Sequence, residues 1–131
     1  MSKKFIAVFC GIVLIGLGLI IMLLFIRAPK IKDFKINEYN RYIDEFQSDK
    51  VLGPIDNAKT AKEKAESVWI EMFGESIKQE KPYKVFFDKS NDVWLVTGSM
   101  HRSLFGEVKG GVANIIIKKS DGKVLAVWHD K

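Results

Sequence analysis

Residue types that commonly perform chemistry are few in this 131-residue sequence, and their spacing forms no recognisable catalytic or metal-binding set. His101 and His129 are the only histidines, and neither has a second histidine four residues away or a cysteine nearby to complete a metal site. Cys10 is the only cysteine, and the serines of the C-terminal half follow no nucleophile-elbow pattern. The sequence therefore predicts solvated histidines, no metal ion or other cofactor, and no enzymatic activity.

A glycine-rich stretch at 106–111 raises the question of phosphate binding. Gly106 is followed by Gly110 and Gly111, but the Lys-Ser/Thr pair of a phosphate-binding loop is missing, and strand-forming residues follow in place of a helix. Gly110 and Gly111 are instead predicted to allow a β-bulge or a close backbone approach at the start of a strand.

Four large aromatic residues allow two interpretations: Trp69, Tyr83, Trp94 and Trp128. They could line a ligand pocket between a helix and a sheet. They could equally fill the core, because each aromatic side chain buries about 150–250 Å² and a small domain needs that area.

Two segments that would help to position these residues have apolar side chains at helical spacing, 37–47 and 57–73. The second has an apolar stripe made of Ala58, Ala61, Ala65, Val68, Trp69 and Met72, with lysines and glutamates on the other side. Asp56 or Asn57 is suited to cap its start, Thr60 and Glu63 would form a capping box, and Gly74 would end it.

After Gly74 the apolar period changes to two, which predicts strands at 83–87, 93–98, 110–118 and 123–129. Strand entry is predicted at the run Glu80-Lys81-Pro82-Tyr83, for which a recognition surface is the second interpretation. Gly98 would end the second strand, and a hairpin turn is predicted at Ser120-Asp121-Gly122. We expect an α+β fold, a small cone-like domain of helices packed on a four-stranded antiparallel sheet.

The N-terminal residues 5–26 contain no charge, and 16 of these 22 residues are Leu, Ile, Val or Phe. As a helix this segment would be about 33 Å long, enough to cross a hydrocarbon core of about 30 Å. The sequence therefore predicts a single-pass membrane protein in which residues 1–27 are a transmembrane anchor in the lipid bilayer, 28–36 a basic linker and 37–131 a soluble domain. Short N-terminal tails usually stay in the cytoplasm, so we expect the soluble domain on the extracytoplasmic, periplasmic side.

The net charge of +5 comes from the residues that flank the hydrophobic segment. From residue 36 onward the chain carries 15 basic and 15 acidic residues. A nucleic-acid-binding domain needs a clustered basic excess, because counterion release supplies most of its affinity. The composition therefore argues against a nucleic acid partner.

Six short motifs follow one another in the C-terminal half: Ala61-x-x-x-Ala65-Glu66, Phe73-Gly74-Glu75-Ser76-Ile77, Glu80-Lys81-Pro82-Tyr83, Trp94-x-Val96-x-Gly98, Gly110-Gly111-Val112 and Lys119-x-x-Gly122-Lys123-Val124-Leu125. In this order the chain resembles, over roughly 60–131, the bacterial immunity proteins with a nuclear-transport-factor-2-like fold. The resemblance implies a protein that binds a cognate toxin domain, usually encoded nearby, and blocks it without chemistry of its own. It implies no catalytic residues.

Three functions follow as hypotheses. The first is a membrane-anchored immunity protein that neutralises a bacterial toxin by stoichiometric protein binding. The alternative is an extracytoplasmic domain that binds a small ligand or an envelope component, without catalysis, in an aromatic cavity around Trp69, Tyr83 and Trp94. The third, an enzyme, would require His101 or His129 to be buried beside a carboxylate with a shifted pKa.

Overall fold

The computed structural model of the protein describes residues 30–101 and 110–131. The predicted anchor at 5–26 lies outside these residues, as does most of the loop that contains Gly106. Across the two described ranges, every helix is too short or too polar to cross a bilayer.

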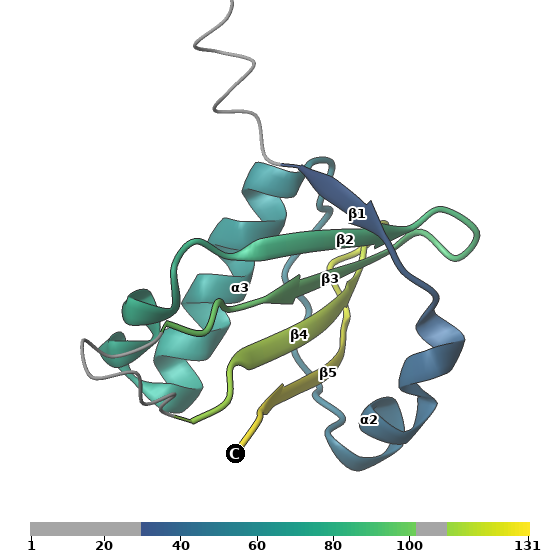
Figure 1. Ribbon diagram of the computed structural model, residues 1–131. Coiled ribbons are helices and arrows are strands. Elements are labelled where there is room, and N and C mark those ends of the chain that lie inside the picture. The colour runs from purple at the N-terminus through teal and green to yellow at the C-terminus, as the bar shows by residue number, and fades with distance from the viewer. Residues whose placement is uncertain (1–29, 102–109) are drawn as a thin grey trace, which may run out of the picture.

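The described domain consists of a sheet with helices packed on it (Figure 1). Its elements in chain order are β1 (Ile31–Asp33), the 3₁₀ helix η1 (Ile36–Tyr39), α2 (Asn40–Glu45), α3 (Ala58–Phe73), the 3₁₀ helix η2 (Glu75–Glu80), β2 (Lys84–Asp88), β3 (Val93–Thr97), β4 (Ala113–Lys118) and β5 (Val124–His129).

The sheet has five strands in the order β1-β2-β3-β4-β5. The α+β class is confirmed, but the predicted four-stranded antiparallel sheet is wrong in one respect. Strand β1, from the segment assigned to the basic linker, pairs parallel with β2, whereas β2 to β5 are antiparallel. Because β1 has only three residues, all of them exposed, it shows no apolar alternation from which a strand could be predicted.

Helix α3 follows its predicted pattern closely. Its buried side chains are Ala58, Ala61, Ala65, Val68 and Trp69. The Asn57 side chain caps the helix by accepting a hydrogen bond from the Thr60 N–H at 2.9 Å, so Thr60 lies inside the first turn and does not begin a capping box. Met72, the last residue of the predicted stripe, is 48% exposed, so the buried stripe of α3 ends at Trp69.

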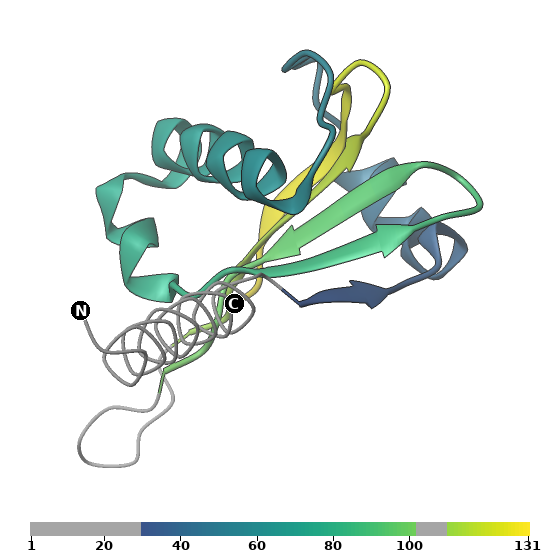
Figure 2. The same cartoon turned by 90° about the horizontal axis from the view of Figure 1, so that it is seen from above.

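The sheet is buried on both faces, which explains why its central strands are almost continuously apolar. On one face, the alternate residues Trp94 and Val96 pack with Ile115 and Ile117 against α3. On the other face, Val93 and Leu95 of β3 pack with side chains from η1 and α2. Figure 2 shows α3 on one side of the sheet and the N-terminal helices on the other.

The N-terminal helical segment is shorter than predicted and is divided into η1 and α2. Its start is fixed by Asp88 at the end of β2, which accepts a hydrogen bond from the Ile36 N–H at 2.9 Å. This bond, followed by one from the Asn91 side chain, holds the pKa of Asp88 below its ordinary value. One side chain, Asp88, therefore holds both the turn that contains Asn91 and the start of η1, and neither local pattern identifies it.

Candidate functional site

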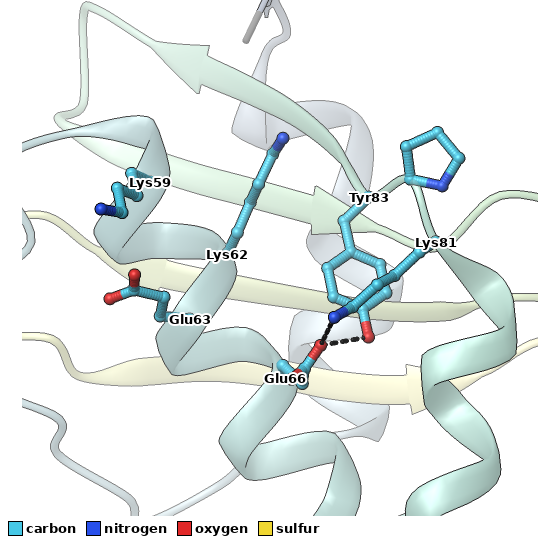
Figure 3. Close-up of a pocket in the computed structure, with 7 residues that line it drawn as sticks. Lys59, Lys62, Glu63, Glu66, Lys81 and Tyr83 are labelled. Carbon is cyan, nitrogen blue, oxygen red and sulfur yellow. Dashed lines mark hydrogen bonds and ion pairs between the residues drawn. The ribbon is translucent and has the colours of Figure 1, made fainter. Parts of the chain in front are cut away.

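A groove lies between α3 and the chain that enters β2 (Figure 3). Its volume is about 580 Å³, compared with about 420 and 220 Å³ for two hollows elsewhere on the described surface. Five of its seven lining residues are charged, and together they are Lys59, Lys62, Glu63, Glu66, Lys81, Pro82 and Tyr83.

One face of α3 supplies the wall of the groove. Lys59, Lys62, Glu63 and Glu66 are spaced at i, i+3, i+4 and i+7, so they lie on one side of the helix. Lys59, Lys62 and Glu66 each follow directly after a residue of the buried stripe, so this charged face borders the core. The opposite wall is the segment 81–83, which continues into β2.

A three-residue hydrogen-bonded cluster joins the two walls. The Tyr83 hydroxyl donates to Glu66 Oε2 at 2.7 Å, and Lys81 Nζ lies 3.0 Å from the same oxygen. Burial, and then the hydrogen bond to Glu66, raise the pKa of Tyr83, while the hydrogen bond from Tyr83 lowers the pKa of Glu66. The Tyr83 ring packs edge-on against Trp69, at 5.1 Å between ring centroids, so the wall is continuous with the core.

The lysines of the helix wall are differently placed from Lys81. Within the described ranges, neither Lys59 nor Lys62 has a carboxylate within ion-pair distance. Lys62 extends from α3 beside Tyr83, whereas Lys59 and Glu63 project together from the outer side of the helix (Figure 3). The groove therefore holds one ion pair, two further ammonium groups and one further carboxylate, that of Glu63.

A second polar cluster lies at the C-terminal end of η2, around Glu80. Glu80 Oε1 accepts from the Ala113 N–H at 2.7 Å, and Oε2 lies 3.0 Å from His129 Nε2. The backbone carbonyl of Glu80 accepts from the Ser99 N–H at 2.7 Å. These contacts tie η2 to β4, to β5 and to the chain that follows β3.

His129 is exposed, as the sequence predicts, but its ring also contacts protein. Its pKa is lowered by burial, but the hydrogen bonds to Glu80 and to the Asp130 carbonyl outweigh burial, and the net pKa is raised. Both ring nitrogens have protein partners, the Asp130 carbonyl oxygen for Nδ1 and Glu80 Oε2 for Nε2. His101 is exposed, as predicted, and its Nε2 contacts the Lys81 carbonyl oxygen. This geometry favours a structural role for both histidines.

Replacing Glu80 by glutamine should reduce the free energy of unfolding more at about pH 6 than at about pH 8.5. Because the pKa of His129 is raised on folding, the pair stabilises the fold fully below the unfolded histidine pKa of about 6.5. That contribution is lost as the pH rises through the folded-state pKa. Glutamine can still accept from the Ala113 N–H, so the variant removes mainly the charge. Urea denaturation at the two pH values measures the difference, with Glu75→Gln as the control because its partner Lys78 is exposed. An equal loss at both pH values would contradict this role.

The predicted aromatic residues do not assemble into one pocket. Trp69 and Trp94 are buried in the core beneath α3, and their indole N–H groups donate to the carbonyl oxygens of Asn114 and Ile55. Trp128 packs on the opposite face of the sheet. Only Tyr83 reaches the groove. The cavity that the small-ligand hypothesis places around Trp69, Tyr83 and Trp94 is therefore occupied by packed side chains.

Either a positive φ angle or close packing favours glycine at these positions of the predicted motifs. A Cβ on Gly98 would lie 2.9 Å from the Glu80 Cβ, and a Cβ on Gly111 would overlap Asp130. Gly74 and Gly110 have φ angles of +91° and +61°, and Gly74 ends α3 as predicted. Gly111 therefore provides the close backbone approach expected before β4, which begins at Ala113.

The sequence motifs identify the wall at 81–83 and one residue of the α3 wall. Glu66, Lys81, Pro82 and Tyr83 all belong to quoted motifs, and the structure brings them together although Glu66 and Lys81 are 15 positions apart. Lys59 and Lys62 were expected only among the lysines on the outer side of the helix, and Glu63 only as part of a capping box. Their i, i+3, i+4 spacing beside Glu66 is the signal that could have identified them as a surface.

Together, the fold and the groove define a small α+β domain with a charged surface depression above a packed core. The profile of the family described as NTF2 fold immunity protein matches residues 60–131, more than half of the chain. The chain therefore belongs to the NTF2 fold immunity proteins, a family whose general role is toxin neutralisation. Neither a curated protein nor a solved structure matches the chain.

Proposed function

We propose that this protein is a membrane-anchored immunity protein that neutralises a cognate toxin domain by stoichiometric binding. The observation that carries the proposal is the family match over residues 60–131. That match covers α3 and β2 to β5, which form a packed platform in which Trp69 and Ile115 are fully buried. Such a platform supplies a preorganised surface, and preorganisation lowers the entropic cost of binding a partner.

The apolar segment 5–26 supports the proposed location. It is long enough to span a bilayer and carries no charge. An anchor there would hold the domain on the extracytoplasmic side of the membrane, where a toxin delivered by another cell first arrives. Tethering also raises the effective concentration of the inhibitor at that surface.

A protection assay tests both parts of the proposal. Cells carry the toxin domain encoded next to this chain, exported to the periplasm, and produce either the full chain or a variant that lacks residues 1–29. We expect the full chain to restore growth and the truncated variant, which stays in the cytoplasm, to fail. A third variant, in which an unrelated transmembrane segment replaces 5–26, should protect as well as the full chain.

The possible results separate the two claims. Absence of protection by the full chain, with the protein present in the membrane fraction, would contradict toxin neutralisation. Equal protection by the truncated variant would retain neutralisation and reject the anchor.

A further inference from the structure

We propose that the groove between α3 and the segment 81–83 is the toxin-facing surface, and that it accepts an acidic, extended segment of the toxin domain against Lys62 and Lys59. This inference rests on the proposed function and adds the contact surface and the chemistry of the partner.

The charges of the groove favour the binding of a partner segment that carries carboxylates. Lys81 is already neutralised by Glu66, at 3.0 Å. Lys59 and Lys62 have no such partner among the described residues, and Glu63 is the remaining lining carboxylate. Lys62 lies on the Tyr83 side, away from Glu63 (Figure 3). A carboxylate that approaches the Lys62 ammonium is therefore repelled least by the Glu63 carboxylate.

The lining favours a protein segment over a small molecule. Small-molecule sites enclose most of their ligand and are lined mainly by apolar side chains. This groove has charged residues at five of its seven lining positions, and Pro82 is exposed at its edge. Pro82 provides a rigid apolar edge beside the lysines, whereas Tyr83 is only 6% exposed and forms part of the floor of the groove. This mainly charged lining suits a segment of a charged protein partner better than a small apolar ligand.

The buried hydroxyl of the groove needs no hydrogen-bond partner from the toxin segment. The Tyr83 hydroxyl donates to Glu66 Oε2, and the Lys81 ammonium uses one of its three donors on the same oxygen. A segment that covers Tyr83 therefore leaves the buried hydroxyl with its partner, which avoids a cost of about 1–3 kcal/mol. The motif residues Glu66, Lys81 and Tyr83 therefore form the rigid part of the groove. Lys59 and Lys62 would select for an acidic partner segment.

Charge reversal at the groove tests the inference. The full chain in detergent micelles is titrated with a catalytically inactive form of the toxin domain encoded beside it, and the dissociation constant is measured for wild type and for Lys59→Glu/Lys62→Glu. We expect the double variant to bind at least about tenfold more weakly, and its affinity to depend less on salt. A toxin variant with one acidic residue changed to lysine should recover part of the loss in the double variant.

A matched control has the same change in net charge outside the groove. Lys64→Glu/Lys123→Glu alters one lysine of α3 and one at the β4–β5 turn, neither of which lines the groove. We expect this control to bind within about threefold of wild type. Circular dichroism and thermal unfolding confirm that all variants are folded, as expected for changes on the surface of α3.

The results distinguish this inference from the function on which it rests. If wild type binds and the groove variant binds equally well, the surface assignment is overturned while neutralisation stands. If the groove and control variants weaken binding equally, only net charge matters and the assignment also fails. If the groove variant loses affinity only for phosphatidylglycerol vesicles, the lysines serve the membrane. If wild type does not bind the toxin domain, the proposed function itself is overturned.

Discussion

Replacing Trp69 by alanine should lower the free energy of unfolding by about 3–5 kcal/mol, the range for removing a buried aromatic side chain. Trp69 is fully buried, its ring meets Tyr83 edge-on, and its indole N–H donates to the Asn114 carbonyl. The substitution therefore leaves a cavity between α3 and β4 and removes the indole hydrogen bond to the Asn114 carbonyl. Because a domain of this size is stable by only about 5–15 kcal/mol, the loss is a large fraction of the total.

Urea denaturation of the full chain in detergent, followed by far-ultraviolet circular dichroism, measures this loss without relying on tryptophan fluorescence. Met72→Ala is the matched control on the same helix, because Met72 is 48% exposed. We expect the control to cost less than about 1 kcal/mol. A Trp69 variant as stable as the Met72 variant would show that α3 does not pack on the sheet through this residue.

Replacing Gly122 by alanine should have the second largest effect, a loss of about 3 kcal/mol or more. Gly122 has a φ angle of +72°, where a side chain costs about 1–3 kcal/mol. A Cβ there would also overlap the carbonyl oxygen of Gly53, and the two backbones are joined by a hydrogen bond from the Leu52 N–H to the Gly122 carbonyl at 2.9 Å. The added methyl group must therefore separate the β4–β5 turn from the segment that precedes α3.

Gly74→Ala separates the two contributions to this loss. Gly74 also has a positive φ angle, +91°, but no atom lies within 4 Å of the position of a Cβ. Its substitution should cost only the conformational term of about 1–3 kcal/mol. Equal losses for the two variants in thermal or urea unfolding would mean that the contact with Gly53 contributes nothing.

The elements with a strong local signal could be predicted from the sequence. Helix α3 has five buried residues at helical spacing and an asparagine cap, so its bounds follow from the pattern. The turns at Gly74 and Gly122 follow from the need for a positive φ angle. Strand β1 could not be predicted in this way, because its pairing with β2 depends on residues more than 50 positions away, as in the register Ile31 to Val85.

The candidate site also contains residues with a local sequence signal and residues without one. The run 80–83 gives a strand entry and, as its second interpretation, a recognition surface, and both Lys81 and Tyr83 line the groove. The contact between His129 and Glu80 joins residues 49 positions apart and has no local signal, so His129 was expected to be solvated. For the tryptophans, in contrast, the residue type itself is a local signal. Their size favours burial, and hydrogen bonds from Trp69 and Trp94 to backbone carbonyls make burial possible.

Titration of toxin activity with the purified full chain tests the central claim, neutralisation by stoichiometric binding, most directly. With the toxin domain held well above the dissociation constant, we expect its residual activity to fall linearly and to reach zero at one equivalent of this protein, independent of incubation time. Full activity at a large excess of the protein, or time-dependent loss of activity at a small fraction of an equivalent, would contradict the claim, the latter because it would require chemistry on the toxin.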